Sequence, residues 1–263
     1  MVSVIIPAFN EEATIARKVG EVIDHPSVRE VIVVDDGSND RTAALAAAAG
    51  ARVIHHARNG GKAAALDAGV AASSGNCLLF LDADVTGYTH AALSRIIDPV
   101  VSGHYEMFVG IRARRTIWLN RVLHFFPIIG GERALTRELW SSVPHDRKQG
   151  FQIEITLNYF AKQTAKGMGF ALIPGTRHYT KEKKYGLMVG LFRRAGMIRD
   201  VVAVSFRLYV LGHFARRGNA RAPHPGPGGA KEPDASKRRR KRSHRNRRPP
   251  GASDSPSATL RGQ

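Results

Sequence analysis

The stretch Cys77-Leu-Leu-Phe-Leu-Asp-Ala-Asp-Val-Thr86 decides the fold. Its apolar run, Leu78–Leu81, is typical of a strand buried on both faces of a parallel sheet. Asp82 and Asp84 follow at once, and ligands of open α/β sheets bind at the carboxyl ends of the strands. Because side chains two apart on an extended chain point the same way, both carboxylates can address one Mg²⁺ or Mn²⁺ ion. The stretch predicts a strand that ends in a metal site, and an aspartate that only caps a turn or helix is the alternative.

The sequence before this stretch alternates strand patterns with helix patterns. The expected strands are residues 2–7, 30–34 and 51–55, and the expected helices cover residues 15–23, 41–49 and 63–72. Such alternation predicts βαβ units and a mainly parallel sheet with flanking helices. Because crossover connections are right-handed, the loops after the strands meet at one sheet edge. The loops expected to converge are residues 7–11, 35–38 and 82–84.

Composition fits a globular domain with a tail, since 43% of the 263 residues are hydrophobic. No stretch reaches the ~20 apolar residues of a membrane span. The single cysteine, Cys77, excludes an internal disulfide and fits a reducing cytoplasm. The first residues carry no basic lead or cleavage site, so we expect a strand there rather than a signal peptide. The expected location is the cytoplasm, with peripheral binding to the inner face of the cell membrane.

The net charge of +18 is uneven along the chain. From Gly218 onward, twelve Lys and Arg residues face three acidic ones, a net +9. The run at residues 237–248 has no core-forming residues, so we expect residues 218–263 to be a disordered basic tail. Such a tail can bind an anionic membrane surface or nucleic acid. No aromatic residue accompanies it for base stacking, so nucleic acid is not expected as the main ligand.

The glycine pair before Lys62 is not a P-loop, because Gly-x-x-x-x-Gly-Lys-Ser/Thr is absent. No Gly-x-Gly-x-x-Gly follows the first strand either, which disfavours dinucleotide oxidoreductases. A lysine with flexible backbone at a helix start can still hold a diphosphate. A surface turn with a solvated lysine is the alternative.

Four motifs together resemble family 2 glycosyltransferases. They are Ser3-Val-Ile-Ile-Pro-Ala-Phe-Asn-Glu-Glu12, Val33-Val-Asp-Asp-Gly-Ser38, Asn59-Gly-Gly-Lys62 and Leu81-Asp-Ala-Asp84. The resemblance covers residues 1–90 and continues more weakly to residue 185. It implies the Rossmann-like GT-A fold over residues 1–185, a nucleotide-sugar donor and a divalent metal, Mg²⁺ or Mn²⁺.

Carried over residue by residue, the resemblance also assigns roles. Asp36 would contact the base or ribose, and Lys62 the diphosphate. Asp82 would contact the ribose or the metal shell, and Asp84 would bind the metal as a catalytic residue. The other donor-binding residues implied are Pro7, Ala8, Asn10, Glu11 and Ala83.

Residues 91–185 are expected to form the acceptor side. In the family a Gly-rich segment lies under the donor sugar, and here Glu132-Arg133 follows such a segment. Glu132-Arg133 either takes part in the chemistry or forms an ion pair at the start of a helix. Many inverting members carry Glu-Asp on a later helix, where the Asp is the base, but this chain has Glu154 followed by isoleucine. Glu154 could act as the base, whereas an acceptor that is already an anion, such as a lipid phosphate, needs none.

The last segments are expected to serve the metal and the membrane. In some GT-A enzymes a late histidine joins the metal shell, and His178 stands in that place, with an ordinary loop histidine as the alternative. Residues 186–217 predict an amphipathic helical extension with interspersed arginines, which either lies in a membrane interface or docks on the sheet.

These patterns favour an inverting, metal-dependent glycosyltransferase. Its donor would be a nucleotide diphosphate sugar, UDP-sugar favoured and GDP-sugar the alternative, and its acceptor is unknown, a polyprenyl phosphate being one candidate. A catalytically inactive membrane or nucleic-acid adaptor is a second hypothesis, against which the intact Asp36, Lys62 and Asp84 argue. A nucleotidyltransferase is a third, although such enzymes usually carry a Gly-rich basic loop where this chain has Pro7-Ala8-Phe9-Asn10.

Overall fold

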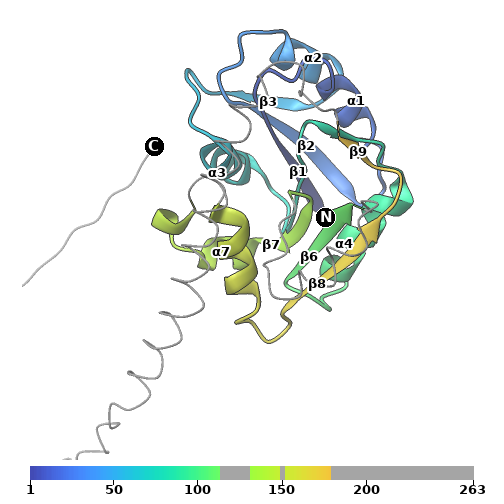
Figure 1. Ribbon diagram of the computed structural model, residues 1–263, viewed down its shortest axis with the longest axis vertical. Coiled ribbons are helices and arrows are strands. Elements are labelled where there is room, and N and C mark those ends of the chain that lie inside the picture. The colour runs from blue at the N-terminus through green and yellow to red at the C-terminus, as the bar shows by residue number, and fades with distance from the viewer. Residues whose placement is uncertain (113–130, 149–151, 179–263) are drawn as a thin grey trace, which may run out of the picture. The chain divides into compact units, whose positions relative to one another are not determined.

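The computed structural model of the protein describes residues 1–112, 131–148 and 152–178. Its centre is a seven-stranded sheet in the order β3-β2-β1-β4-β7-β6-β8 (Figure 1). The strands are β1 Val2–Ala8, β2 Val28–Asp35, β3 Arg52–His55, β4 Cys77–Phe80, β6 Met107–Arg112, β7 Arg133–Thr136 and β8 Met168–Ile173. The helical extension expected at residues 186–217 and the basic tail at 218–263 lie outside the described residues.

The sheet is mixed but mostly parallel, which confirms the expected fold class. Strands β3, β2, β1 and β4 are parallel neighbours, and β6 is parallel to β8. Between these groups β7 runs antiparallel to both β4 and β6. The reading of Glu132-Arg133 as a helix-start ion pair is wrong, because Arg133 is the first residue of β7.

Helices cover both faces of the sheet, as Figure 1 shows for α1 and α4 on one side and α3 and α7 on the other. The first group is α1 Ile15–Gly20, α2 Thr42–Ala48 and α4 His90–Val101. The second is α3 Lys62–Ala72, α6 Arg137–Ser142 and α7 Gln152–Ala161, with a 3₁₀ turn, η2, at His145–Arg147. No helix in the described part of the chain is long and apolar enough to cross a membrane.

Strand β4 forms part of the core on both sides, which explains its unbroken apolar run. Leu79 packs with the α1 and α4 residues, whereas Leu78 and Phe80 pack against the α3, α6 and α7 side. The Phe80 ring meets the Trp140 ring edge to face, with 5.1 Å between the centroids. Burying one such side chain contributes about 1.5–3 kcal/mol, so β4 stabilises both layers.

A second, two-stranded sheet follows the Asp-x-Asp sequence directly. It joins β5 Val85–Thr86 to β9 Arg177–His178 in antiparallel register, with Val85 opposite His178. The turn after β5 needs Gly87, which has a φ of +92° and whose added Cβ would lie 2.7 Å from the Gly175 carbonyl oxygen. This pairing brings the backbone of His178 to the chain segment that follows the two aspartates.

Candidate active site

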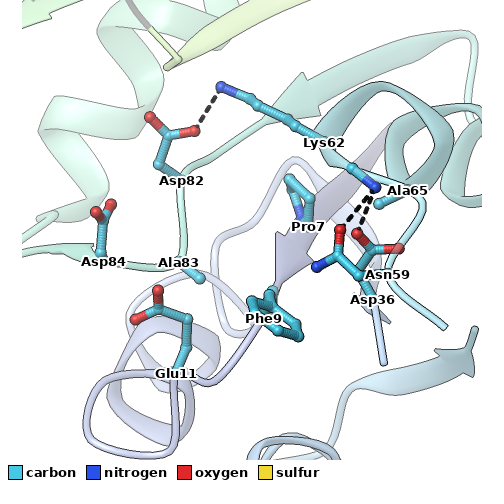
Figure 2. Close-up of a pocket in the computed structure, with 12 residues that line it drawn as sticks. Pro7, Phe9, Glu11, Asp36, Asn59, Lys62, Ala65, Asp82, Ala83 and Asp84 are labelled. Carbon is cyan, nitrogen blue, oxygen red and sulfur yellow. Dashed lines mark hydrogen bonds and ion pairs between the residues drawn. The ribbon is translucent and has the colours of Figure 1, made fainter. Parts of the chain in front are cut away.

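The loops after β1, β2 and β4 converge at one edge of the sheet, as the parallel order requires. They surround a cavity of about 500 Å³ (Figure 2). Its lining residues are Pro7, Ala8, Phe9, Glu11, Asp36, Asn59, Gly61, Lys62, Ala65, Asp82, Ala83 and Asp84. This set brings together every donor-binding residue expected from the sequence except Asn10.

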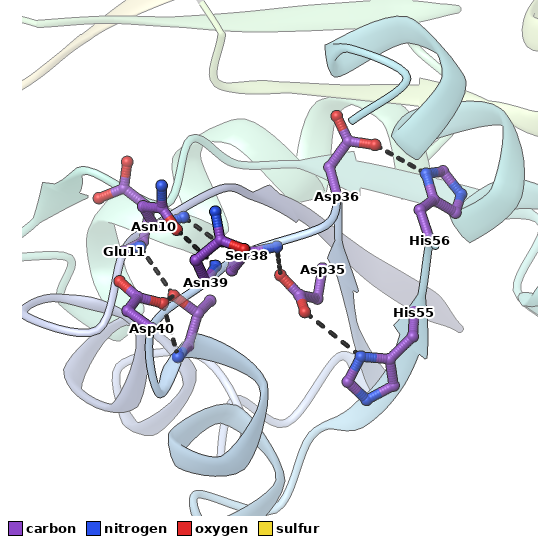
Figure 3. Close-up of polar contacts among 10 residues, drawn as sticks. Asn10, Glu11, Asp35, Asp36, Ser38, Asn39, Asp40, His55 and His56 are labelled. Carbon is purple, nitrogen blue, oxygen red and sulfur yellow. Dashed lines mark hydrogen bonds and ion pairs between the residues drawn. The ribbon is translucent and has the colours of Figure 1, made fainter. Parts of the chain in front are cut away.

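Asn10 does not line the cavity, because it serves the neighbouring loop. It adopts a positive φ of 55°, and its side-chain carbonyl accepts a hydrogen bond from the Asn39 amide at 2.9 Å (Figure 3). Its own amide donates to Ser38 Oγ at 2.9 Å. Asn10 therefore links the loop after β2 to the loop after β1, and the direct donor contact expected for it stays a prediction.

Asp36 is a buried carboxylate held by three donors (Figure 3). Its Oδ1 accepts from the Gly60 amide at 2.9 Å and from His56 Nδ1 at 2.7 Å, and its Oδ2 accepts from the Gly61 amide at 2.7 Å. An ionised carboxylate offers about four lone-pair sites, so these bonds leave room for one more donor on Oδ2. Asp36 thus fixes the 59–61 loop and keeps one acceptor position at the cavity.

Lys62 bridges two carboxylates that lie far apart in the sequence. From the first turn of α3, its Nζ donates to Asp82 Oδ1 at 2.8 Å and to Glu154 Oε1 at 2.9 Å. Burial disfavours the ammonium charge, but Asp82 and Glu154 outweigh burial and raise the pKa of Lys62. Figure 2 shows the Lys62–Asp82 contact at the cavity, with the Asp84 carboxylate apart from it. The site therefore carries a permanently charged lysine.

Arg133 holds Glu154 from the opposite direction. The Arg133 side chain is 1% exposed, and its Nη1 donates to the Glu154 backbone carbonyl at 3.2 Å. Its Nη2 lies 3.7 Å from Glu154 Oε2. Burial lowers the pKa of Arg133, and Glu154 is the first of the carboxylates that oppose this shift. Each oxygen of the Glu154 carboxylate thus faces one cation, Lys62 or Arg133.

The carboxylates of Asp82 and Asp84 suit a hard divalent cation. Among the described side chains, no three from His, Cys, Asp and Glu are grouped to hold a metal ion. Mg²⁺ commonly takes only one or two protein carboxylates and completes its shell with phosphate oxygens and water. The donor set therefore fits a cation shared with a diphosphate. The backbone of His178 pairs beside this loop, while its side chain lies outside the described part of the chain.

The structure adds residues that motif reasoning missed. Phe9 lines the cavity and is 41% exposed although it is aromatic. Its place in the first-strand motif does not reveal this exposure. Ala65 and Asn59 complete the wall beside Lys62. Gly131 packs against Asp82 so closely that an added Cβ would collide with the carboxylate. The sequence shows the glycine pair that contains Gly131, but it does not reveal the contact of Gly131 with Asp82.

The fold and the site together define a nucleotide-binding α/β protein with an acidic, metal-compatible strand end. The chain belongs to glycosyl transferase family 2, whose model matches residues 3–152. It is therefore a glycosyltransferase with a GT-A fold, which confirms the family, the enzyme class and the fold expected from the sequence.

Two curated relatives illustrate the range of similarity. The undecaprenyl-phosphate 4-deoxy-4-formamido-L-arabinose transferase of Pseudomonas aeruginosa is 34% identical over 125 residues, 44% of this chain and 36% of that protein. The transferase of the same description from Aeromonas hydrophila is 28% identical over 213 residues, 72% of this chain and 64% of that protein. The chain thus spans about a third to two thirds of the length of these relatives.

Solved structures of one enzyme match most of the chain. Glucosyl-3-phosphoglycerate synthase from Mycobacterium tuberculosis, in complex with Mn²⁺, UDP-glucose and phosphoglyceric acid, has a TM-score of 0.65 and 26% identity, covering 78% of each chain. The same enzyme in complex with Mg²⁺ and UDP has a TM-score of 0.64 and 26% identity, again covering 78% of each chain.

Proposed function

We propose that the protein transfers a sugar from a nucleotide diphosphate sugar, preferably a UDP-sugar, to the phosphate of a polyprenyl phosphate. The reaction is a single displacement that inverts the anomeric carbon and depends on Mg²⁺ or Mn²⁺. Support for the donor and metal comes from the solved structures with UDP-glucose, UDP, Mn²⁺ and Mg²⁺. Support for the acceptor comes from the relatives named as undecaprenyl-phosphate transferases.

The observation that carries the acceptor is the pairing of Glu154. A general base needs a free oxygen directed at the acceptor hydroxyl. Both Glu154 oxygens instead face cations, at 2.9 Å from Lys62 Nζ and 3.7 Å from Arg133 Nη2. Both oxygens are thus engaged by cations rather than left for an acceptor hydroxyl. A phosphate acceptor is already ionised, so its transfer needs no base.

In this proposal Glu154 positions Lys62 rather than moving a proton. Lys62 lies beside Asp82, and its charge attracts the donor diphosphate into the cavity. Asp36, Pro7 and Ala8 line the same cavity, and in the proposal they contact the nucleoside. The remaining donor contacts in the proposal are Glu11 and Ala83.

The metal would be held by Asp84, with Asp82 and His178 in or next to its shell. A bound divalent cation would neutralise the charge that develops on the leaving diphosphate. On the protein side, Asp84 supplies a carboxylate that lines the same cavity as Asp82 and Lys62. That placement supports its assignment as the principal ligand.

The test is transfer of radiolabelled sugar into an organic-soluble product. The full chain is incubated with a panel of labelled UDP-sugars and GDP-sugars, Mn²⁺, and undecaprenyl phosphate in detergent. We expect label to enter the organic phase only when lipid phosphate and metal are both present. Equal labelling without undecaprenyl phosphate, or no label in the organic phase with any donor, would contradict the proposal.

A soluble phosphorylated acceptor is the second candidate. It is favoured by the solved structures that hold phosphoglyceric acid together with UDP-glucose and Mn²⁺. The same assay separates the two, because a small phosphorylated product stays in the aqueous phase. Label in a new aqueous product that requires phosphoglyceric acid would establish this candidate instead.

A further inference from the structure

Asp84 lies in the turn that joins the central sheet to the two-stranded sheet. It follows β4 and comes directly before β5, whose partner strand β9 contains His178. The chain leaves the central sheet at Leu81, whose amide donates to the Ile5 carbonyl at 3.2 Å. The course of residues 82–84 therefore depends on where β5 is held as well as on β4.

A carboxylate at the end of α1 holds the chain directly after β5. Glu21 accepts hydrogen bonds from the Gly87 amide, at 2.8 Å on Oε1 and 2.9 Å on Oε2, and from the Tyr88 amide at 3.2 Å on Oε2. These two amides are the first after β5, which ends at Thr86. Because a hydrogen bond to an ionised carboxylate is stronger than one to a neutral acceptor, Glu21 ties β5 firmly to α1.

The position of Glu21 is unfavourable for the helix itself. Glu21 is the C-cap residue of α1, and the carboxyl end of a helix carries a partial negative charge that disfavours an acidic side chain. Arg17, one turn earlier, donates from Nε to Glu21 Oε1 at 2.9 Å, but its side chain is 69% exposed and solvent screens the pair. The helix alone gives no reason for a glutamate here, whereas the two loop amides do.

Glu30 holds a loop in the same way at the opposite end of β4. Its carboxylate accepts hydrogen bonds from Ser3 Oγ at 2.7 Å, from the Ser74 amide at 2.7 Å and from Ser74 Oγ at 2.8 Å. Ser74 precedes β4, so Glu30 acts at the end of the strand away from Asp84. Glu21 and Glu30 therefore form a matched pair, of which only Glu21 acts on the side of the proposed metal site.

We propose that Glu21 is a positioning residue for the metal site. By holding the chain after β5, it fixes the turn that carries Asp84 and the strand that pairs with the backbone of His178. The inference rests on the proposed metal role of Asp84. Mutation of an outer group that orients a metal ligand typically changes metal affinity about 10–100-fold. Because Glu21 acts through the backbone, we expect the lower end of this range.

The test measures Mn²⁺ binding to the full chain in saturating UDP, from the electron paramagnetic resonance signal of free Mn²⁺. Glu21→Asp keeps the charge but withdraws both oxygens from the loop amides by one methylene, so we expect Mn²⁺ affinity to fall about tenfold. Glu21→Gln removes the charge but keeps one carbonyl oxygen, with two lone pairs, in reach of both amides. We expect its Mn²⁺ affinity to stay within about threefold of the unmodified chain.

The order of the two variants separates positioning from a long-range effect of charge. An effect of charge alone would weaken Mn²⁺ binding in Glu21→Gln and spare Glu21→Asp. The proposal is therefore overturned if Glu21→Gln loses as much Mn²⁺ affinity as Glu21→Asp, or more. A Glu21→Asp chain that does not fold, or that binds Mn²⁺ within about twofold of the unmodified chain, would make the contact structural and overturn the proposal as well.

Glu30→Asp is the matched control, because it shortens a carboxylate that holds a loop at the other end of β4. We expect Glu30→Asp to lower the midpoint of urea unfolding, as Glu21→Asp does, while its Mn²⁺ affinity stays within about twofold of the unmodified chain. Similar losses of Mn²⁺ affinity in the two aspartate variants would show that both glutamates act through stability alone, against the proposal.

Asp84→Asn, assayed with Mn²⁺ and UDP together, separates this inference from the proposed function. If Asp84→Asn leaves Mn²⁺ binding unchanged, the proposed metal site is wrong and the inference fails with it. If Asp84→Asn removes Mn²⁺ binding while Glu21→Asp binds Mn²⁺ like the unmodified chain, only the role of Glu21 fails.

Discussion

At the scale of the residue, the site is a set of carboxylates that differ in what holds them. Asp36 is fixed by two backbone amides and a histidine, whereas Asp82 and Glu154 share the ammonium of Lys62. Asp84 lines the cavity beyond these contacts. Carboxylates in and next to this cavity therefore anchor a loop and position a lysine, and we propose that Asp84 binds the metal.

Asp84→Asn tests the metal role at this scale. The substitution preserves size and removes one charge from the cation, so we expect activity to fall at least ~100-fold, equivalent to about 3 kcal/mol of transition-state stabilisation. Asp98→Asn, which changes an exposed carboxylate on α4, should leave activity unchanged. Turnover by Asp84→Asn within about threefold of the unmodified enzyme would remove Asp84 from the metal site.

His56 and His55 allow a matched test of the proposed contact between Asp36 and the nucleoside. Each histidine places its Nδ1 near an aspartate (Figure 3): His56 lies 2.7 Å from Asp36, and His55 lies 3.3 Å from Asp35. Of the two aspartates, only Asp36 lines the cavity. A hydrogen bond to a charged group contributes about 1.5–3 kcal/mol, so His56→Ala should raise the donor KM about tenfold and change kcat less. His55→Ala should leave both constants unchanged. Equal effects of the two variants would show that the pairs are only structural.

The sequence predicted the cavity well because parallel strands must end at one edge, which brings Asp36, Lys62 and Asp84 together. It could not predict the partners of Lys62. Glu154 lies 92 residues after Lys62 in the sequence, and its contact with Lys62 depends on how α7 packs. The sequence could not predict the contacts of Asn10 with the loop after β2 either, because they accompany a positive φ, which a motif does not reveal.

At the scale of the element, β4 contributes side chains to the core on both faces of the sheet. Strand β7, in contrast, was not predicted as a strand, because it begins with an arginine and contains only four residues, Arg-Ala-Leu-Thr. Its arginine is tolerated in the core because Glu154 and Asn158 accept from the guanidinium. Burial with such partners overrides the polar appearance of the sequence.

The importance of β4 predicts a large loss of stability in Leu79→Ala. Leu79 is 0% exposed, and truncating a buried leucine costs about 2–5 kcal/mol. Leu172→Ala removes the same atoms from a side chain that is 51% exposed on β8 and should cost less than about 0.5 kcal/mol. Urea unfolding followed by circular dichroism gives both values. Similar losses in the two variants would argue against β4 as the centre of the core.

At the scale of the whole molecule, we propose a GT-A domain over residues 1–185 with its donor half at 1–90, followed by the helical extension 186–217 and the basic tail 218–263. The sequence supports this division through its shift in composition and charge. The described residues support the fold of the first part. The extension and tail are proposed to bring the enzyme to an anionic membrane surface, where a lipid-linked acceptor is found.

Liposome binding tests this arrangement. A polybasic segment gains about 1 kcal/mol per basic residue near an anionic bilayer, and salt screens the gain. The full chain should therefore co-sediment with anionic liposomes at low salt. Truncation after Arg217 should remove most of the salt-dependent binding and leave a weaker, salt-independent part from the extension. A truncated protein indifferent to liposomes would mean that residues 186–217 pack on their own domain.

The role of Glu154 is the most direct test of the whole account, because it separates an ionised acceptor from a hydroxyl acceptor. The measurement is kcat and donor KM of Glu154→Gln with undecaprenyl phosphate as the acceptor. Glutamine keeps the shape and leaves Lys62 with one carboxylate, so we predict a higher donor KM and a kcat within about tenfold of the unmodified enzyme. Loss of a general base typically costs about 10²–10⁴ in rate. A kcat reduced by at least ~1000-fold with an unchanged donor KM would contradict the account and make Glu154 the catalytic base.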